Sequence, residues 1–162
     1  MLVLGLDPST KSTGYGIINV LGSVHAYVEC GVLTARASAP LQERQQEILA
    51  GLREVLEEHR PDIVGIETQF ANPKFPLSGI KVAAIRGQLT AVCTMACLTV
   101  HEFSPANVKR IVAGRGQSSK RQVQDAVKLR LGLHKLPQTD AADALAIAIT
   151  LAAKLRQQRR AA

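Results

Sequence analysis

The order of the apolar segments constrains the fold more than any other feature of this sequence. Three strand-like runs come first, separated by an Asp-Pro turn and a Gly-Ser turn, and two more then alternate with helix-like segments. Strands in close succession predict an antiparallel meander, whereas strands separated by helices predict parallel pairs. We therefore expect an α/β fold with a five-stranded mixed sheet flanked by helices on both faces. The expected strands are 2–7, 15–21, 24–35, 62–67 and 99–104.

The first helix is predicted by the spacing of its apolar residues, and the others by apolar content and by residues that start or end helices. Between residues 40 and 60 an apolar stripe with the helical period opposes a polar face, and Pro61 ends the pattern. The segment 77–98 is apolar enough to be covered on more than one side. No internal repeat or linker is visible, so we expect one domain over residues 1–156 and a loose basic tail over 157–162. Further helices are expected at 105–113, 119–131 and from about 139.

Composition and cysteine usage exclude several classes of protein. Hydrophobic residues make up 46% of the chain, which argues against disorder. No apolar run reaches the roughly 18 residues of a membrane span, and "LVLGLD" directly after Met1 is no cleavable signal, so we expect no membrane partner. Cys30, Cys93 and Cys97 lack the spacing of a zinc site, so we expect buried free thiols. A reducing, cytoplasmic location fits these features.

The positive charge is concentrated in the last third of the chain. Residues 1–104 carry 8 Lys and Arg against 10 Asp and Glu, whereas residues 105–162 carry 12 against 3. The net charge of +7 therefore divides into −2 and +9. This asymmetry favours a polyanionic partner, and nucleic acid before membrane because no amphipathic anchor is visible. A basic run can also be no more than a solvated face.

Four acidic residues stand at the ends of apolar elements, where an unpaired carboxylate is costly to bury. Asp7 and Glu67 end the first and fourth strands, and Asp140 and Asp143 lie three positions apart, on one face of the last helix at its start. Each residue alone has a simpler explanation, because acidic side chains stabilise helix starts and often occur in turns at strand ends. All four together, beside a basic half, favour a shared site.

The expected topology would bring these carboxylates together. If the first and fourth strands are neighbours, Asp7 and Glu67 meet at one edge of the sheet, and the last helix can add Asp140 and Asp143. Oxygen ligands without His or Cys select Mg²⁺ or Mn²⁺. Two such ions roughly 3.5–4 Å apart would activate a water molecule and stabilise the leaving oxygen of a phosphodiester.

Four segments also carry a family resemblance: "GLDPSTKSTGYG", "IETQF", "VKRIVAGRGQSSKRQVQ" and "TDAADALAIAIT". In this order, and over nearly the whole chain, they resemble the RuvC family of Holliday junction resolvases. The resemblance implies an RNase H-like fold, a homodimer, and Mg²⁺- or Mn²⁺-dependent cleavage of two like-polarity strands of a four-way DNA junction during recombination and repair. It further implies a junction branch-migration complex as a partner. The implied catalytic metal ligands are Asp7, Glu67, Asp140 and Asp143.

The same resemblance places DNA contacts on Phe70, Lys109 and Lys120. An exposed Phe beside a charged site can stack on a base, although a loop Phe can also anchor its loop to the core. Lys120 and Arg121 open a helix, where positive side chains oppose the helix dipole unless an anion such as phosphate offsets them. Arg115 lies in the "GRG" stretch, which is flexible enough to approach a DNA backbone, so it joins the expected DNA-binding residues.

Three other functions compete with junction cleavage. "GLDPSTKSTGYG" also looks like the phosphate loop of actin-like ATPases and sugar kinases, but those enzymes close two lobes over a nucleotide and this chain has the length of one. An inert DNA-binding module would explain the charge and leave the carboxylates unexplained. Another RNase H-like, metal-dependent nuclease would need the same acids, so only the family resemblance selects the junction as substrate.

Overall fold

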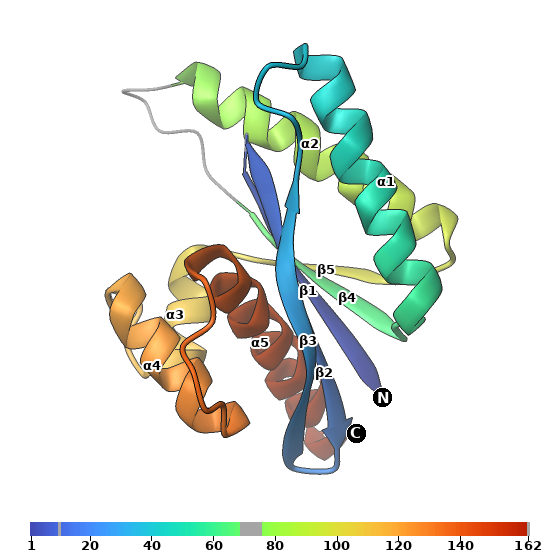
Figure 1. The fold of residues 1–162 in the computed structure, drawn as a ribbon. Helices are drawn as coiled ribbons and strands as arrows, with labels where there is room; N and C mark the ends of the chain where they lie inside the picture. Colours follow the sequence, from blue (N-terminus) through green and yellow to red (C-terminus); the bar gives the residue numbers. More distant parts are fainter. Residues whose placement is uncertain (10, 69–75, 162) are drawn as a thin grey trace.

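The sheet contains five strands and has the mixed topology that the sequence predicts (Figure 1). The computed structural model describes residues 1–9, 11–68 and 76–161. Strand β1 is central, pairs antiparallel with β2 and parallel with β4, and the strand order is β3-β2-β1-β4-β5. The strands are β1 (Leu2–Pro8), β2 (Ser12–Leu21), β3 (Val24–Thr34), β4 (Ile63–Glu67) and β5 (Val100–Phe103).

Helices cover both faces of the sheet, as expected (Figure 1). Helices α1 and α2 enclose one apolar core against the sheet, and α3, α4 and α5 enclose a second core on the opposite face. The helices are α1 (Leu41–His59), α2 (Pro76–Met95), α3 (Pro105–Ala113), α4 (Lys120–Leu131) and α5 (Thr139–Ala161).

Helix α5 lies directly on the sheet because small residues face each other there. Gly5 on β1 is flanked in register by Gly16 on β2 and Gly65 on β4, so a row of glycines crosses three strands. A Cβ atom added at Gly16 would lie 2.7 Å from the backbone nitrogen of Leu145, and one at Gly5 would collide with the carbonyl oxygen of Ala144. The absent side chains therefore let an alanine-rich helix pack backbone against backbone.

Three boundaries differ from the sequence-based predictions by three residues or more, and the others differ by at most one. Strand β2 begins at Ser12 instead of residue 15, because Thr13 pairs with Pro8 and extends the ladder. Helix α2 ends at Met95 because Cys97 takes a left-handed φ of 61°. The loose tail expected after residue 156 is wrong, since α5 continues to Ala161; basic side chains in its last turn favour the helix dipole.

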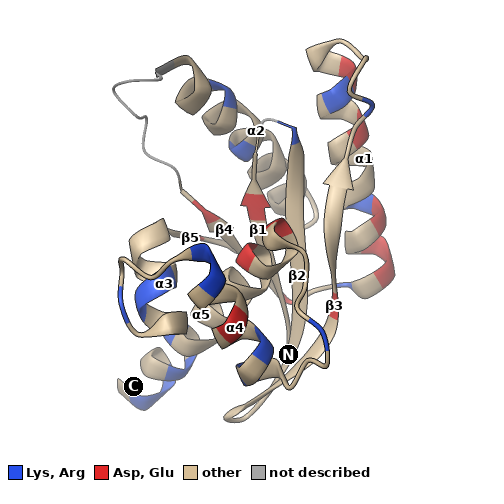
Figure 2. Ribbon diagram, turned by 60° about the vertical axis from the view of Figure 1, so that its left-hand side comes forward, with Lys and Arg blue, Asp and Glu red and all other residues tan. Residues whose placement is uncertain are grey.

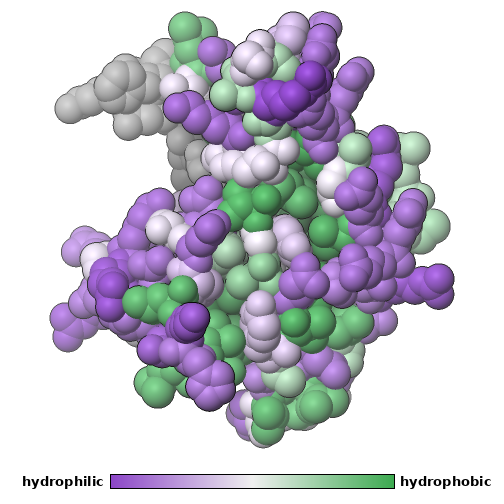
Figure 3. Space-filling model, viewed as in Figure 1, coloured by the Kyte–Doolittle hydropathy of each residue, from purple (hydrophilic) through white to green (hydrophobic). Residues whose placement is uncertain are grey.

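Charge and hydropathy are unevenly distributed over the surface. Figure 2 shows Lys and Arg on α3, on α4 and toward the C-terminal end of α5, whereas acidic residues gather on α1. Figure 3 shows apolar residues at the lower end of the view, where the β2–β3 hairpin turns; Leu21 and Val24 there are 58% and 61% exposed. Among the described residues, no helix is both long and apolar enough to cross a membrane.

The three cysteines are free, as predicted, but they are not all buried. Cys93 lies in the core on the α1–α2 side of the sheet, Cys30 is half-buried and Cys97 is exposed. The expectation of three buried thiols was therefore wrong for two of them, because Cys30 lies on an edge strand and Cys97 follows the end of α2.

Candidate active site

The parallel pairing of β1 and β4 places two carboxylates side by side. Leu6 is in register with Ile66, so the next residues, Asp7 and Glu67, are neighbours at the carboxyl ends of these strands. Side chains alternate along a strand, so both carboxylates point to the same face as the glycine row that carries α5. The predicted meeting of Asp7 and Glu67 at one end of the sheet is confirmed.

The first turn of α5 reaches the same place because Gly14 has no side chain. Gly14 is opposite Asp7 on the neighbouring strand, and a Cβ atom at Gly14 would collide with the carbonyl oxygen of Asp140. Ser12, at the start of β2, donates a hydrogen bond from Oγ to Asp140 Oδ2 at 3.1 Å. Asp143 lies one turn further along α5, on the same face of the helix.

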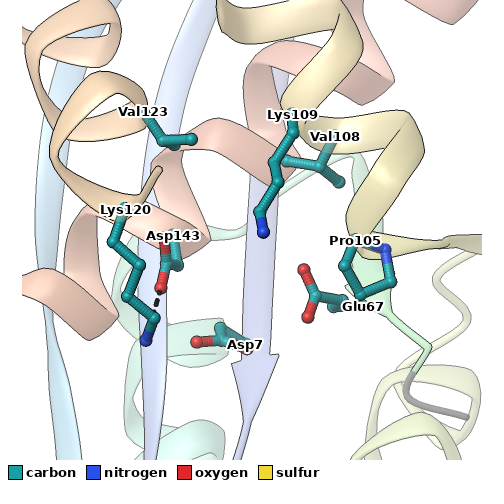
Figure 4. Close-up of a pocket in the computed structure, with 8 residues that line it drawn as sticks. All are labelled: Asp7, Glu67, Pro105, Val108, Lys109, Lys120, Val123 and Asp143. Atoms are coloured by element: carbon teal, nitrogen blue, oxygen red, sulfur yellow. Dashed lines mark ion pairs between the residues drawn. The ribbon is translucent and has the colours of Figure 1, made fainter. Parts of the chain in front are cut away.

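Three of the four predicted carboxylates line one cavity of about 190 Å³ (Figure 4). Two lysines and an apolar wall complete the lining within the described part of the chain, and Asp140 is not among the lining residues. Asp140 is instead held by Ser12 beside the cavity. The lining residues are Asp7, Glu67, Asp143, Lys109, Lys120, Pro105, Val108 and Val123.

The carboxylates of this cavity repel one another and are poorly solvated. Burial raises the pKa of Asp7 to about 8, and the negative charges of Glu67, Asp143 and Asp140 add to the shift. Burial, followed by the charge of Asp143, raises the pKa of Glu67 to about 7. The pKa of Asp143 is also raised by burial, although the Lys120 ammonium opposes the shift. The site therefore holds more negative charge than its two lysines compensate.

The donor set fits divalent cations. Among the described residues, the lining offers carboxylate oxygens and contains no His or Cys, which matches the preference of Mg²⁺ and Mn²⁺ for hard oxygen ligands. Burial first, and repulsion between the carboxylates second, raise the pKa values of Asp7 and Glu67, and bound cations would stabilise the charged forms of both. Half-buried carboxylates in excess over local cations are unfavourable for folding alone, so a ligand explains them better than a structural role does.

The two lysines approach the cavity from different helices. Lys109 extends from α3 and Lys120 from the first turn of α4 (Figure 4). Lys120 Nζ lies 3.6 Å from Asp143 Oδ2, but the lysine side chain is largely exposed, so this ion pair contributes little stability. The Lys120 ammonium group therefore remains available to a phosphate. Ser119 caps α4 through its hydroxyl, which fixes where Lys120 leaves the helix.

The other predicted DNA contacts are less closely associated with the cavity. Arg121 is exposed, and its Nε donates to Asp125 Oδ2 at 3.1 Å within α4. Arg115 is exposed in the connection between α3 and α4. Phe70 lies outside the described residues, so its predicted stacking role stays a prediction.

Sequence reasoning missed the residues that position the site without touching the cavity. Ser12 was not recognised because its partner Asp140 is far away in sequence. Gly14 and Gly16 did leave a signal, because glycines at alternate positions of a strand lie on one face and mark a close backbone approach.

Comparisons with known proteins agree with this geometry. Residues 3–151 match the family described as crossover junction endodeoxyribonuclease RuvC. The protein of that name from Afipia carboxidovorans is 41% identical over 91% of this chain and 86% of its own length, and that from Citrifermentans bemidjiense is 37% identical over 92% and 90%. The match to the structure of Thermus thermophilus RuvC covers 98% of this chain and 97% of that protein's chain, with a TM-score of 0.87 and 32% identity. The structure of T. thermophilus RuvC in complex with Holliday junction substrate covers 98% and 96%, with a TM-score of 0.89 and 32% identity. The chain therefore belongs to the RuvC family of crossover junction endodeoxyribonucleases.

Proposed function

We propose that this chain resolves four-way DNA junctions by metal-dependent hydrolysis of phosphodiester bonds. The observation that carries the proposal is the convergence of three half-buried carboxylates and two lysines on one cavity, in a chain of the RuvC family. The relative from T. thermophilus, solved with a Holliday junction substrate, supports the junction as the substrate class. Family membership also argues against a phosphotransferase, and the carboxylates argue against an inert DNA-binding module.

In this proposal the acids hold metal and the bases hold DNA. Asp7, Glu67 and Asp143 are the metal ligands that line the cavity, and Asp140 completes the set from beside it. Two Mg²⁺ or Mn²⁺ ions held there would supply an activated water and stabilise the leaving oxygen. Lys109 and Lys120 orient the scissile phosphate by direct ion pairing. The apolar wall restricts water, which strengthens these interactions.

Two cuts in one junction require two active sites, and α2 offers a surface through which two copies could pair. Leu77, Ile80 and Met95 are exposed on this helix, at 71%, 62% and 82%. The exposed residues between them, Ala84, Gly87 and Ala91, continue the same helical stripe with small side chains. We infer a twofold homodimer in which the two α2 helices pack closely. Changing Ala84→Glu should convert the dimer to a monomer in sedimentation without loss of fold.

The cellular setting follows from the substrate. An enzyme that cuts junctions in chromosomal DNA would work in the cytoplasm of a bacterial cell and would receive its junctions from a branch-migration complex. Both statements rest on the proposed function and on the family resemblance.

A cleavage assay with two substrates tests the proposal. A labelled four-way junction and a linear duplex of matching sequence are incubated with the protein, with and without Mg²⁺ or Mn²⁺. Paired nicks in the junction that require metal are expected, with the duplex left intact. The Glu67→Gln variant should bind the junction and fail to cut it. Equal cutting of the linear duplex, or cutting by Glu67→Gln at the normal rate, would refute the proposal.

A further inference from the structure

A second concave surface lies at the far end of α5 from the carboxylates. It has a volume of about 440 Å³ and is formed by the turn of the β2–β3 hairpin, the last turn of α4 and the C-terminal part of α5. Three arginines from two helices line it, together with His25 of the hairpin. We call this surface the distal basic cleft and define it by Arg130, Arg156, Arg160 and His25.

The distal basic cleft concentrates positive charge without a local counter-charge. Its lining contains no Asp or Glu among the described residues, and none of its three arginines forms an ion pair with a described carboxylate. Burial and the charges of Arg130 and Arg156 lower the pKa of His25, so the imidazole also experiences a positive potential. Three exposed guanidinium groups that converge in this way repel one another unless an anion binds between them.

The Arg130 side chain of the distal basic cleft is held in place by a hydrogen bond within the protein. Arg130 donates from Nη2 to the carbonyl oxygen of Ile111 at 2.9 Å, which ties the end of α4 to α3. This hydrogen bond restricts the Arg130 side chain and leaves its other N–H groups for a ligand. A guanidinium held in place loses less conformational entropy when it binds a phosphate.

Helix α4 connects the distal basic cleft to the candidate active site. Lys120 and Arg121 lie in its first turn, where Lys120 lines the cavity, and Lys128 and Arg130 lie in its last turn. Figure 2 shows this spacing as basic residues at both ends of α4. From Asp143 to Arg156 the axis of α5 rises about 20 Å, which is the length of about six base pairs of duplex DNA.

We propose that the distal basic cleft binds the phosphate backbone of a junction arm about six base pairs from the cleavage site. The inference rests on the proposed function, because it takes the DNA arm from the junction that the active site cuts. The exposed apolar residues Leu21 and Val24 beside the cleft would favour a protein partner instead. The basic residues at both ends of α4 favour DNA, because a backbone leaving the active site meets positive side chains at each end of that helix.

Binding of junctions with long and short arms tests the proposal. The double variant Arg156→Gln, Arg160→Gln is compared with Arg53→Gln, Arg60→Gln, a pair of exposed arginines near the C-terminal end of α1 that removes the same charge. Both pairs are placed in the Glu67→Gln background so that the junction stays intact. With arms of about 20 base pairs, the distal variant should bind about tenfold more weakly, and its salt slope should fall by about two units. With arms of about 4 base pairs that are closed by hairpin loops, so that the junction stays assembled and its arms end before the cleft, the affinity of the distal variant should equal that of the control.

The outcomes separate this proposal from the proposed function. Metal-dependent cutting of the short-arm junction by the unmodified chain supports the function whatever the cleft does. An equal loss of affinity for both arm lengths would overturn the arm contact, because the lost charge would then act on the junction without touching an arm. Unchanged affinity and salt slope with long arms would also overturn it and would leave a protein-docking role for the cleft. Loss of thermal stabilisation by inorganic phosphate in the distal variant, without any effect of arm length, would likewise overturn it in favour of a small-anion site.

Discussion

Replacing Asp7 with Asn should stabilise the metal-free protein while it abolishes cleavage. Asp7 is the most perturbed acid of the site, because burial and three neighbouring carboxylates raise its pKa from 3.8 to about 8. A raised pKa means that the folded state binds more protons than the unfolded state between these two values. The contribution of Asp7 to the stability of the folded state is therefore fully present below pH 3.8 and is lost progressively as the pH rises through about 8. An amide of the same shape carries no such penalty.

The size of the effect follows from the shift. Each pKa unit corresponds to about 1.4 kcal/mol, so a rise from 3.8 to about 8 sets an upper bound of about 5 kcal/mol at pH 8. Water penetration and local relaxation reduce such penalties, because buried sites behave as if their dielectric constant were well above that of dry protein. We expect a measured gain of roughly 2 kcal/mol near pH 8, or about 4–8 °C in Tm for a chain of this size. Near pH 5 the gain should be clearly smaller.

Thermal unfolding of both proteins, with and without millimolar Mg²⁺, measures these quantities. Mg²⁺ should raise the Tm of the unmodified chain, because ligands that bind only the folded state stabilise it, and should have little effect on the Asp7→Asn variant. Equal Tm values for the two metal-free proteins near pH 8 would refute the reasoning. So would a gain that is the same near pH 5 and near pH 8, because it would not come from ionisation.

Three further predictions test other parts of the site. Gly14→Ala should push the first turn of α5 away from β2, which should cost about 1–3 kcal/mol of stability and most of the Mg²⁺-dependent cleavage. Gly51→Ala is the control, because a Cβ atom there would meet only the Leu33 side chain, at 3.3 Å, and it should be nearly neutral in both measurements. Lys120→Ala should weaken junction binding equally for all sequences and lower the salt slope by about one unit; an unchanged slope would make Lys120 a solvated surface residue. Phe70→Ala should lose cleavage far more than binding, because stacking of Phe70 on an exposed base recovers about 1–3 kcal/mol. Unpaired bases at the crossover should partly rescue the variant, and full activity of the variant would remove the stacking role.

The sequence alone determined the kinds of elements and the chemistry of the site. Apolar runs, one helical stripe and the Gly and Pro residues between segments located the five strands and five helices that the structure describes, because a strand or helix must bury at least one face. The acids at strand and helix ends stood out for the same reason, since Asp7 and Glu67 interrupt segments that are otherwise apolar. The prediction of oxygen ligands for a metal ion needed no coordinates.

Only the tertiary structure decided how these residues meet. The register of β1 with β4 puts Asp7 beside Glu67, and the missing side chain of Gly14 brings the first turn of α5 against β2. The structure also separated Asp143, which lines the cavity, from Asp140, which Ser12 holds beside it. The distal basic cleft joins a hairpin turn to the ends of two helices. Local pattern could not predict these features, because strand register and helix docking depend on contacts between residues far apart in the chain, and those contacts leave no repeating signal in the sequence.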